Sequence, residues 1–403
     1  MQSLQTPGDE AAVPLASGGS RSTDAIATLE FFAVRPRWLF VRLETREGAV
    51  GWGEATLEGH TEAVMGALDA ARDRLIGHDP ERIEDTWQLL HRLGFYRGGP
   101  VLLSAIAGID QALWDIKARK LGVPIYQLLG GRVRDRIAVY AWVGGDRPQD
   151  IIAGAAARKQ QGFTAVKMNA VEDMAWLESF AQIDALVERI GQVRDCGIEV
   201  GVDFHGRMHK PMARAALKAI EPVRPLFAEE VLLGEQIAAI KQIADQTSVP
   251  LAMGERQYTR WDFRPLLECA AIDIVQPDIA HAGGISETRR IAAMAETYDV
   301  GFAPHSPIGP LALAACLHVA ATTPNFVIQE MSLGIHYNGP SEDLSTLIKN
   351  PEMFAIANGS VAVPDGPGLG VEIDELAVRE AAKIPHRWRS PPWRGPHGEL
   401  REW

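Results

Sequence analysis

Three carboxylates recur at one interval in the middle of the chain. Asp203, Glu229 and Glu255 each close a short apolar run, and 26 residues separate each from the next. About 25 residues is the length of one strand–helix unit with its loops. In a parallel barrel the carboxyl ends of the strands open onto one face, so these side chains are predicted to converge as ligands for Mg²⁺. Capping of the following helix is the alternative for any one of them.

Two histidines follow strand-like runs at the same level. A metal held by three carboxylates leaves positions for a substrate carboxylate and acidifies its α-proton by stabilising the enediolate. His305 is the predicted base, with Asp278 holding its ring, although Asp278 could instead be a turn residue after Pro277. His205 lies two residues beyond Asp203, so strand alternation points it into the same cavity as the predicted acid for a departing β-hydroxyl.

Other polar residues end strand-like runs and are predicted to contact the substrate. Glu330 is expected to donate a hydrogen bond to the enediolate if it stays protonated, and otherwise to be a rim residue. Trp38, in a loop of the first part of the chain, is expected to reach over the site, with hydrophobic packing as its alternative. The remaining expected substrate contacts are Lys167, Asn169 and Arg256.

The rhythm of strand, loop and helix from residue 136 explains how such residues would be brought together. Eight apolar runs alternate with amphipathic helical segments, which is typical of a (β/α)₈ barrel, here predicted over residues 136–345. Near-continuous apolar runs fit strands buried on both faces of a parallel sheet. The runs are IAVYAWV, FTAVKMN, IEVGVDF, LFAEEV, VPLAMGE, IDIVQPD, VGFAPH and FVIQEMS.

A different pattern precedes the barrel. Alternation over Trp38–Thr45 and Ala49–Ala55 predicts a β-hairpin, and Ser104–Gly122 predicts a long helix with a Ser N-cap and a Gly stop. A meander followed by helices describes an α+β capping domain over residues 25–135. Within it, the segment FYRGGP is a polar-aromatic stretch that could reach over a neighbouring active site.

Two terminal segments lack a core of their own. Residues 1–24 are rich in Ser, Gly and Pro without a basic region before an apolar stretch, so a disordered extension is expected rather than a signal peptide. Residues 346–403 are turn-rich and end in a stretch dense in Pro, Arg and Trp. This tail is expected to pack back on the capping domain.

Composition limits the partners. A net charge of −12 and a pI near 5.4 argue against nucleic acid, and no apolar run reaches membrane-spanning length. Three cysteines without CxxC spacing favour a reducing compartment, so a cytoplasmic protein is expected. An acidic protein can still bind an anionic substrate when a metal or local basic residues supply the positive field.

Several stretches resemble the enolase superfamily, mandelate racemase subgroup. The resemblance implies a homo-oligomer with one Mg²⁺ per subunit on Asp203, Glu229 and Glu255, and an acid sugar as substrate. It implies dehydration, D-galactonate giving 2-dehydro-3-deoxy-D-galactonate and water, by loss of the C2 proton to His305 and of the 3-hydroxyl with His205 as acid. The stretches are PRWLFVRLET, GFYRGGP, SAIAGIDQALWDIK, YAWVGGDRP, VKMN, GVDFHGR, AGGI, APHSPIGPLALAACLH and QEMSLGIHYN.

Two departures and three alternatives accompany this resemblance. Val231 stands where a Pro is usual, and the pair Lys167 and Asn169 replaces Lys-x-Lys, so a second base for racemisation is missing. Dehydration of another aldonate, such as gluconate or mannonate, or epimerisation of a related acid remains open because hydroxyl configuration is read by pocket shape. A non-catalytic sugar-acid binder is disfavoured, because it has no use for an acid and a base.

Overall fold

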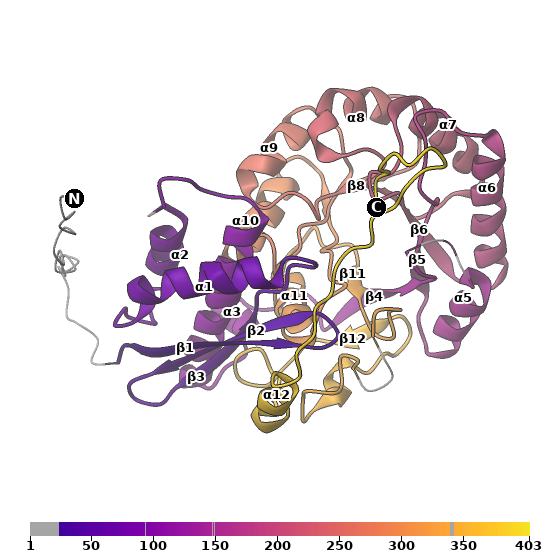
Figure 1. The fold of residues 1–403 in the computed structure, drawn as a ribbon. Coiled ribbons are helices and arrows are strands. Elements are labelled where there is room, and N and C mark those ends of the chain that lie inside the picture. The colour runs from indigo at the N-terminus through magenta and orange to yellow at the C-terminus, as the bar shows by residue number, and fades with distance from the viewer. Residues whose placement is uncertain (1–23, 93, 147, 149, 339–341) are drawn as a thin grey trace, which may run out of the picture.

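The computed structural model describes residues 24–92, 94–146, 148, 150–338 and 342–403 (Figure 1). Apart from Asp24, the extension expected over residues 1–24 lies outside the described residues. The described helices include none with the length and apolar character needed to cross a membrane.

The first part of the chain forms an antiparallel sheet covered by helices. The hairpin of β2 and β3 is confirmed, and β1 pairs with β2 on its other side. Helix α3 packs so closely on β3 that a Cβ on Gly53 would lie 2.1 Å from the carbonyl oxygen of Gly108, which explains the glycines of this strand. The elements are β1 (Ile26–Val34), β2 (Trp38–Thr45), β3 (Val50–Glu54), α1 (Thr61–Leu75), α2 (Ile83–Arg92), α3 (Pro100–Leu121) and α4 (Ile125–Leu128).

The predicted start of α3 is wrong, and its predicted end is confirmed. The helix begins at Pro100 after Gly99, so Ser104 is a fully buried residue of the second turn and not an N-cap. Proline suits the first helical position because its missing N–H has no intrahelical partner there. Gly122 ends the helix in the left-handed conformation, with φ 69°.

The second part closes into a barrel of parallel strands, as predicted. Neighbouring strands pair in chain order from β4 to β10, β11 pairs with β4, and a bridge between Phe302 and Phe326 joins β10 to the segment before β11. Seven strands lie within their predicted runs and are shorter, because the chain leaves the sheet where the loops begin. Strand β4 starts one residue before its run, at Arg136. The strands are β4 (Arg136–Val143), β5 (Ala165–Asn169), β6 (Glu199–Asp203), β7 (Ala228–Glu229), β8 (Leu251–Met253), β9 (Ile274–Val275), β10 (Gly301–Phe302) and β11 (Gln329–Met331).

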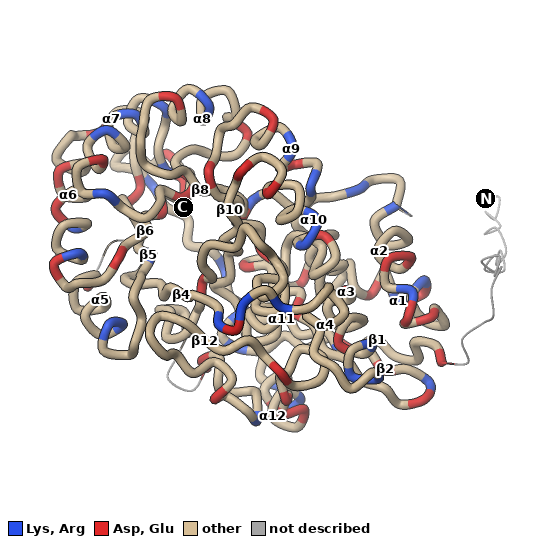
Figure 2. The backbone as a smooth tube through the Cα atoms, turned by 180° about the vertical axis from the view of Figure 1, so that it is seen from behind, with Lys and Arg blue, Asp and Glu red and all other residues tan. Residues whose placement is uncertain are grey.

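Helices surround this barrel (Figure 1). Over α6 to α9, Lys and Arg positions are interspersed with Asp and Glu positions along the described chain (Figure 2). The helices are α5 (Ile151–Gln160), α6 (Phe180–Asp195), α7 (Lys210–Ile220), α8 (Ile237–Ala244), α9 (Arg260–Glu268), α10 (Gly284–Glu296) and α11 (Pro310–Thr322).

Buried acids of the capping region join it to the barrel. Glu54 accepts hydrogen bonds from the backbone N–H groups of Gly309 and Ala312, at 2.8 and 3.0 Å, at the start of α11. Asp110 accepts from the N–H of Ser286 at 3.0 Å, at the start of α10. Helix N-termini favour negative charge, so these contacts fix the capping region over the strand ends.

The tail packs on both parts of the molecule, not on the capping region alone. Helix α12 (Glu375–Ala381) pairs with β1 through Arg379 and Glu30 at 2.9 Å, while β12 (Ser360–Ala362) pairs with β4 of the barrel. Beyond α12 the chain crosses to the barrel, where the ring of Trp393 lies 4.6 Å from the guanidinium of Arg207.

Candidate active site

A cavity of about 270 Å³ lies where the strand ends meet the capping region and the tail. It contains both predicted acid–base histidines and one predicted metal ligand, so most of the predicted set does converge. Its barrel wall includes Lys167, His205, Glu255, His305 and Glu330; its remaining wall includes Arg37, Leu57, Glu58, Tyr337, Ser390 and Trp403.

The three carboxylates end neighbouring strands. Asp203 on β6 lies in register with Glu229 on β7, and Glu255 follows β8. One oxygen of Asp203, Oδ2, is buried without a hydrogen-bond partner. Ligand atoms of Asp203, His205 and Glu255 lie within 4.8 Å of one another. Hard oxygen donors around a buried carboxylate oxygen that accepts no hydrogen bond, and whose neighbours include Lys167 Nζ at 3.4 Å and His205 Nε2 at 3.2 Å, fit a divalent cation.

Glu229 is engaged elsewhere in this structure. Its Oε1 accepts from Lys167 Nζ at 2.7 Å and its Oε2 from Gln276 Nε2 at 2.7 Å. Each carboxylate oxygen can accept more than one contact, so Glu229 can join a cation with Asp203 and keep the bond from Gln276. The alternative that these acids cap the following helices does not describe Asp203 and Glu229. Their carboxylates accept from the N–H of His205 and from the side chains of Lys167 and Gln276, none of which lies in a helix.

Lys167 supplies the positive charge at the centre of the acids. Its Nζ lies 2.7 Å from Glu229, 3.1 Å from Glu330 and 3.4 Å from Asp203. Burial lowers the pKa of this lysine, but Glu229 and Glu330 outweigh it and hold the pKa well above its usual value. These carboxylates therefore favour the ammonium form of Lys167, which is a binding partner for carboxylates.

His305 is held by a carboxylate. Its Nδ1 lies 2.8 Å from Asp278 Oδ2, and its Nε2 lies 3.1 Å from Glu255. Burial lowers the pKa of His305, but Glu330, Glu255 and Asp278 outweigh it and raise the pKa well above its usual value. Asp278 also accepts from the N–H of Ala280 at 2.7 Å, so it orients the ring and shapes the turn at once.

His205 is held by an amide. Its Nδ1 lies 2.7 Å from Asn169 Oδ1, while Asn169 Nδ2 donates to the carbonyl of Gly145 at 2.6 Å. Because the amide nitrogen is engaged by Gly145, its oxygen faces His205 and assigns the ring proton to Nδ1. Burial lowers the pKa of His205 to about 4, with Asp203 and Glu255 opposing. Its Nε2 lies 3.2 Å from Asp203.

The other predicted contacts are placed as follows. Trp38 is buried in the core and stacks on Phe40 at 5.9 Å, so its expected substrate contact is wrong and the packing alternative holds. Asn169 is fully buried behind His205 and does not line the cavity. Arg256 does line it, paired with Glu230 at 2.9 Å.

Glu330 is buried in the cavity wall and is not a rim residue. Its Oε1 lies 3.1 Å from Lys167, and its Oε2 accepts from the N–H of Ser306 at 2.9 Å. Both oxygens accept, so the expected donation to an enediolate would require a proton that these contacts do not supply. Val231, the departure from the usual Pro, is buried in the barrel core.

Sequence reasoning missed the residues that come from outside the barrel strands. Arg37 and Glu58 reach the cavity from the capping region, Ser390 and Trp403 from the tail, and His281 from the turn after Asp278. His281 stands in the run IAHAGGI, where a histidine so soon after a strand-end acid was the one available signal.

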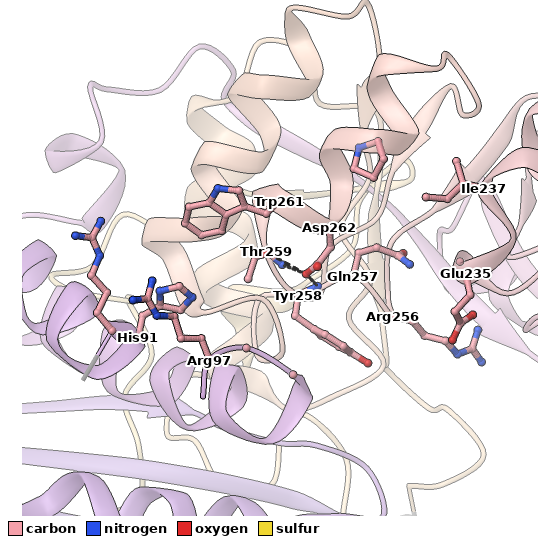
Figure 3. A pocket seen from close by; sticks show the side chains of 15 residues that line it. His91, Arg97, Glu235, Ile237, Arg256, Gln257, Tyr258, Thr259, Trp261 and Asp262 are labelled. Atoms are coloured by element: carbon pink, nitrogen blue, oxygen red, sulfur yellow. Dashed lines mark hydrogen bonds between the residues drawn. The ribbon is translucent and has the colours of Figure 1, made fainter. Parts of the chain in front are cut away.

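A second hollow of about 750 Å³ adjoins this cavity, and its lining side chains are drawn in Figure 3. It shares Arg256 and Tyr258 with the cavity and includes Arg97 of the segment FYRGGP. There Asp262 accepts from the N–H groups of Tyr258 and Thr259, at 3.1 and 2.9 Å (Figure 3). The segment therefore lies beside the cavity of its own chain.

Family comparison agrees with this architecture. Residues 32–130 match the mandelate racemase / muconate lactonizing enzyme N-terminal domain, and residues 150–377 match the enolase C-terminal domain-like family. The chain therefore belongs to the mandelate racemase / muconate lactonizing enzyme family of the enolase superfamily.

Individual relatives within this family are similar to the chain over nearly its whole length. The chain is 50% identical over 381 residues to the D-galactonate dehydratase of Ralstonia pickettii (strain 12J) and to that of Pectobacterium atrosepticum, covering 94% of this chain and 100% of each relative. An enolase from Agrobacterium radiobacter, solved with Na and L-malate, is 33% identical with a TM-score of 0.84, covering 94% of this chain and 100% of that one.

Proposed function

We propose that this protein is a Mg²⁺-dependent D-galactonate dehydratase, a hydro-lyase that forms 2-dehydro-3-deoxy-D-galactonate and water. The observation that carries the proposal is the pair of differently held histidines across one cavity. His205 follows β6 and His305 follows β10, four strands apart in a ring of eight, so they face the substrate from opposite sides. The named relatives at 50% identity supply the substrate.

Asp203, Glu229 and Glu255 would hold the cation. When bound, Mg²⁺ stabilises the enediolate and, by offsetting the neighbouring carboxylates, favours the neutral form of His305. Lys167 would bind the substrate carboxylate through the ammonium group that now contacts Glu229. The predicted Glu330 contact to the enediolate stays a prediction.

Each histidine then moves one proton. His305 takes the C2 proton at Nε2, while Asp278 fixes the ring through Nδ1. His205 gives a proton from Nε2 to the 3-hydroxyl, which leaves as water. The incoming substrate carboxylate favours the imidazolium form of His205, because a nearby negative charge raises a histidine pKa. Because the two groups face each other, we expect anti elimination.

The test is turnover of D-galactonate with and without metal. Chelation should abolish keto-acid formation and added Mg²⁺ should restore it. Glu229→Gln should weaken Mg²⁺ binding measured by calorimetry, since it replaces an anionic ligand with a neutral one. Full activity after exhaustive chelation would refute the metal-dependent mechanism.

The C2 epimer separates dehydration from epimerisation. D-talonate would present its C2 proton toward Lys167, whose ammonium form the neighbouring carboxylates favour over the neutral amine that a base requires. In deuterated buffer we therefore expect neither keto-acid formation at rates rivalling galactonate nor interconversion of the two acids. Rapid epimerisation would show that a second base exists. The expected homo-oligomer and cytoplasmic location stay predictions, to be checked by sedimentation and by cell fractionation.

A further inference from the structure

One carboxylate enters the cavity from the capping region. Glu58, just beyond β3, lines the cavity and is 15% exposed. Its Oε2 lies 3.2 Å from His281 Nε2, and its Oε1 lies 3.6 Å from Arg37 Nη2. Glu58 therefore faces the cavity between two basic side chains and takes no part in the proton transfers described above.

The charge of Glu58 is fixed by these neighbours. Burial alone would raise the pKa of Glu58, but Arg37 and His281 outweigh it and hold the pKa below its usual range. Burial likewise lowers the pKa of His281, but Asp278 and Glu58 outweigh it and raise this pKa to about 8. At neutral pH the carboxylate is therefore anionic and paired.

Arg37 is itself held in place. Its Nη2 donates to the carbonyl of Pro307 at 3.1 Å, and its guanidinium lies 3.8 Å from the ring centroid of Tyr337. Because these two contacts hold Arg37, its ion pair with Glu58 keeps the carboxylate at the cavity wall. The result is a preorganised hydrogen-bond acceptor on the cap side.

The direction of the substrate brings its far end to this acceptor. The proposed carboxylate-binding and proton-transfer groups all belong to the barrel, whose interior beneath them is filled by side chains. The carbons beyond C3 must therefore leave the barrel toward the capping region. Hydroxyl groups donate hydrogen bonds to a carboxylate. A second substrate carboxylate cannot donate, and it finds Arg37 and His281 already paired with the anionic Glu58.

We propose that Glu58 is a specificity residue that accepts hydrogen bonds from substrate hydroxyls beyond C3 and excludes acid sugars with a carboxylate at the far end. This inference rests on the proposed function and names its substrate class more closely: aldonates are accepted and aldarates are excluded. Arg37 and His281 act as positioning residues for Glu58.

The first measurement needs no variant. The Mg²⁺-loaded protein should turn over D-galactonate with a kcat/KM at least about 100-fold above that for D-galactarate, which differs only in its terminal carboxylate. Equal kcat/KM values for the two acids would overturn the inference while leaving the dehydratase proposal intact. Failure to turn over D-galactonate at all would instead remove the proposed function.

Variants then locate the discrimination. Glu58→Gln should lower kcat/KM for D-galactonate by about 10- to 100-fold, the range for losing a hydrogen bond to a charged group. It should also reduce the preference over D-galactarate by at least about tenfold, because the repelling charge is gone. Glu58→Asp keeps the charge and should keep the preference. A preference unchanged in Glu58→Gln would overturn the inference.

A matched control is available on the same part of the molecule. Glu30 also belongs to the capping region and also pairs with an arginine, Arg379 at 2.9 Å, but it does not line the cavity. Glu30→Gln should leave the ratio of the two kcat/KM values unchanged. If this control changes the ratio as much as Glu58→Gln does, the ratio depends on the net charge of the capping region, and the assignment to Glu58 is wrong.

Discussion

The two sides of the cavity carry the same side chain with different partners. His305 Nδ1 meets the carboxylate of Asp278 at 2.8 Å, and His205 Nδ1 meets the amide of Asn169 at 2.7 Å. The ring geometry is alike, but a carboxylate favours the imidazolium and an amide adds no charge. The comparison supports our proposal that the group behind each ring decides which histidine acts as the base and which as the acid.

Removing the ring held by Asp278 should have the largest effect. His305→Asn removes the proposed acceptor of the C2 proton, so the rate of dehydration should fall by about 10⁴-fold, the upper end of the range for general-base catalysis. Exchange of the C2 proton with deuterated solvent should be lost with it, as proton NMR can show. Exchange at the wild-type rate would mean that another residue is the base.

Removing the ring held by Asn169 should slow dehydration but not the exchange of the C2 proton. In His205→Asn we expect dehydration to fall by about 10²–10³-fold, within the range for general-acid catalysis, while C2 exchange continues. A 3-fluoro analogue, whose leaving group needs less help, should restore elimination in His205→Asn and not in His305→Asn. The reverse pattern would show that the two roles have been exchanged.

Making the two sides alike tests the comparison directly. Asp278→Asn gives His305 the kind of partner that His205 has, and activity should fall by about 10–100-fold, as is typical when the partner behind a catalytic ring is lost. Asp273→Asn is the control, because Asp273 accepts from the N–H of Leu251 at 2.8 Å at the other end of β9. Equal losses in both variants would point to folding and not to His305.

Replacing the amide behind His205 with a carboxylate should have the smallest effect. Asn169→Asp keeps an oxygen facing His205 but removes the donor to the carbonyl of Gly145. Losing this donor costs about 0.5–1.5 kcal/mol, while the new carboxylate favours the imidazolium form of His205 that gives the proton, so we expect activity to fall by less than about tenfold. A loss as large as that of Asp278→Asn, measured as keto-acid formation, would show that the amide is as critical as the carboxylate.

Local pattern was enough to predict the barrel and the groups at its strand ends. The period of strand and helix placed Asp203, Glu229 and Glu255 on neighbouring strands, and strand order alone placed His205 across from His305. This works because every parallel strand delivers its last residues to one face. Helix starts are harder to predict, as Ser104 shows, because the sequence does not distinguish a buried serine inside a helix from a serine at the N-cap.

The sequence by itself therefore determined the fold class and the barrel wall of the cavity, since both follow from residues close in the chain to a strand end. Only the tertiary structure decided the remaining wall, which the capping region and the tail supply. Glu58 and Trp403 reach the cavity because the capping region and the tail dock on the barrel, whereas Trp38, one residue from Arg37, turns into the core. Such contacts depend on how distant segments pack, and no local period records that packing.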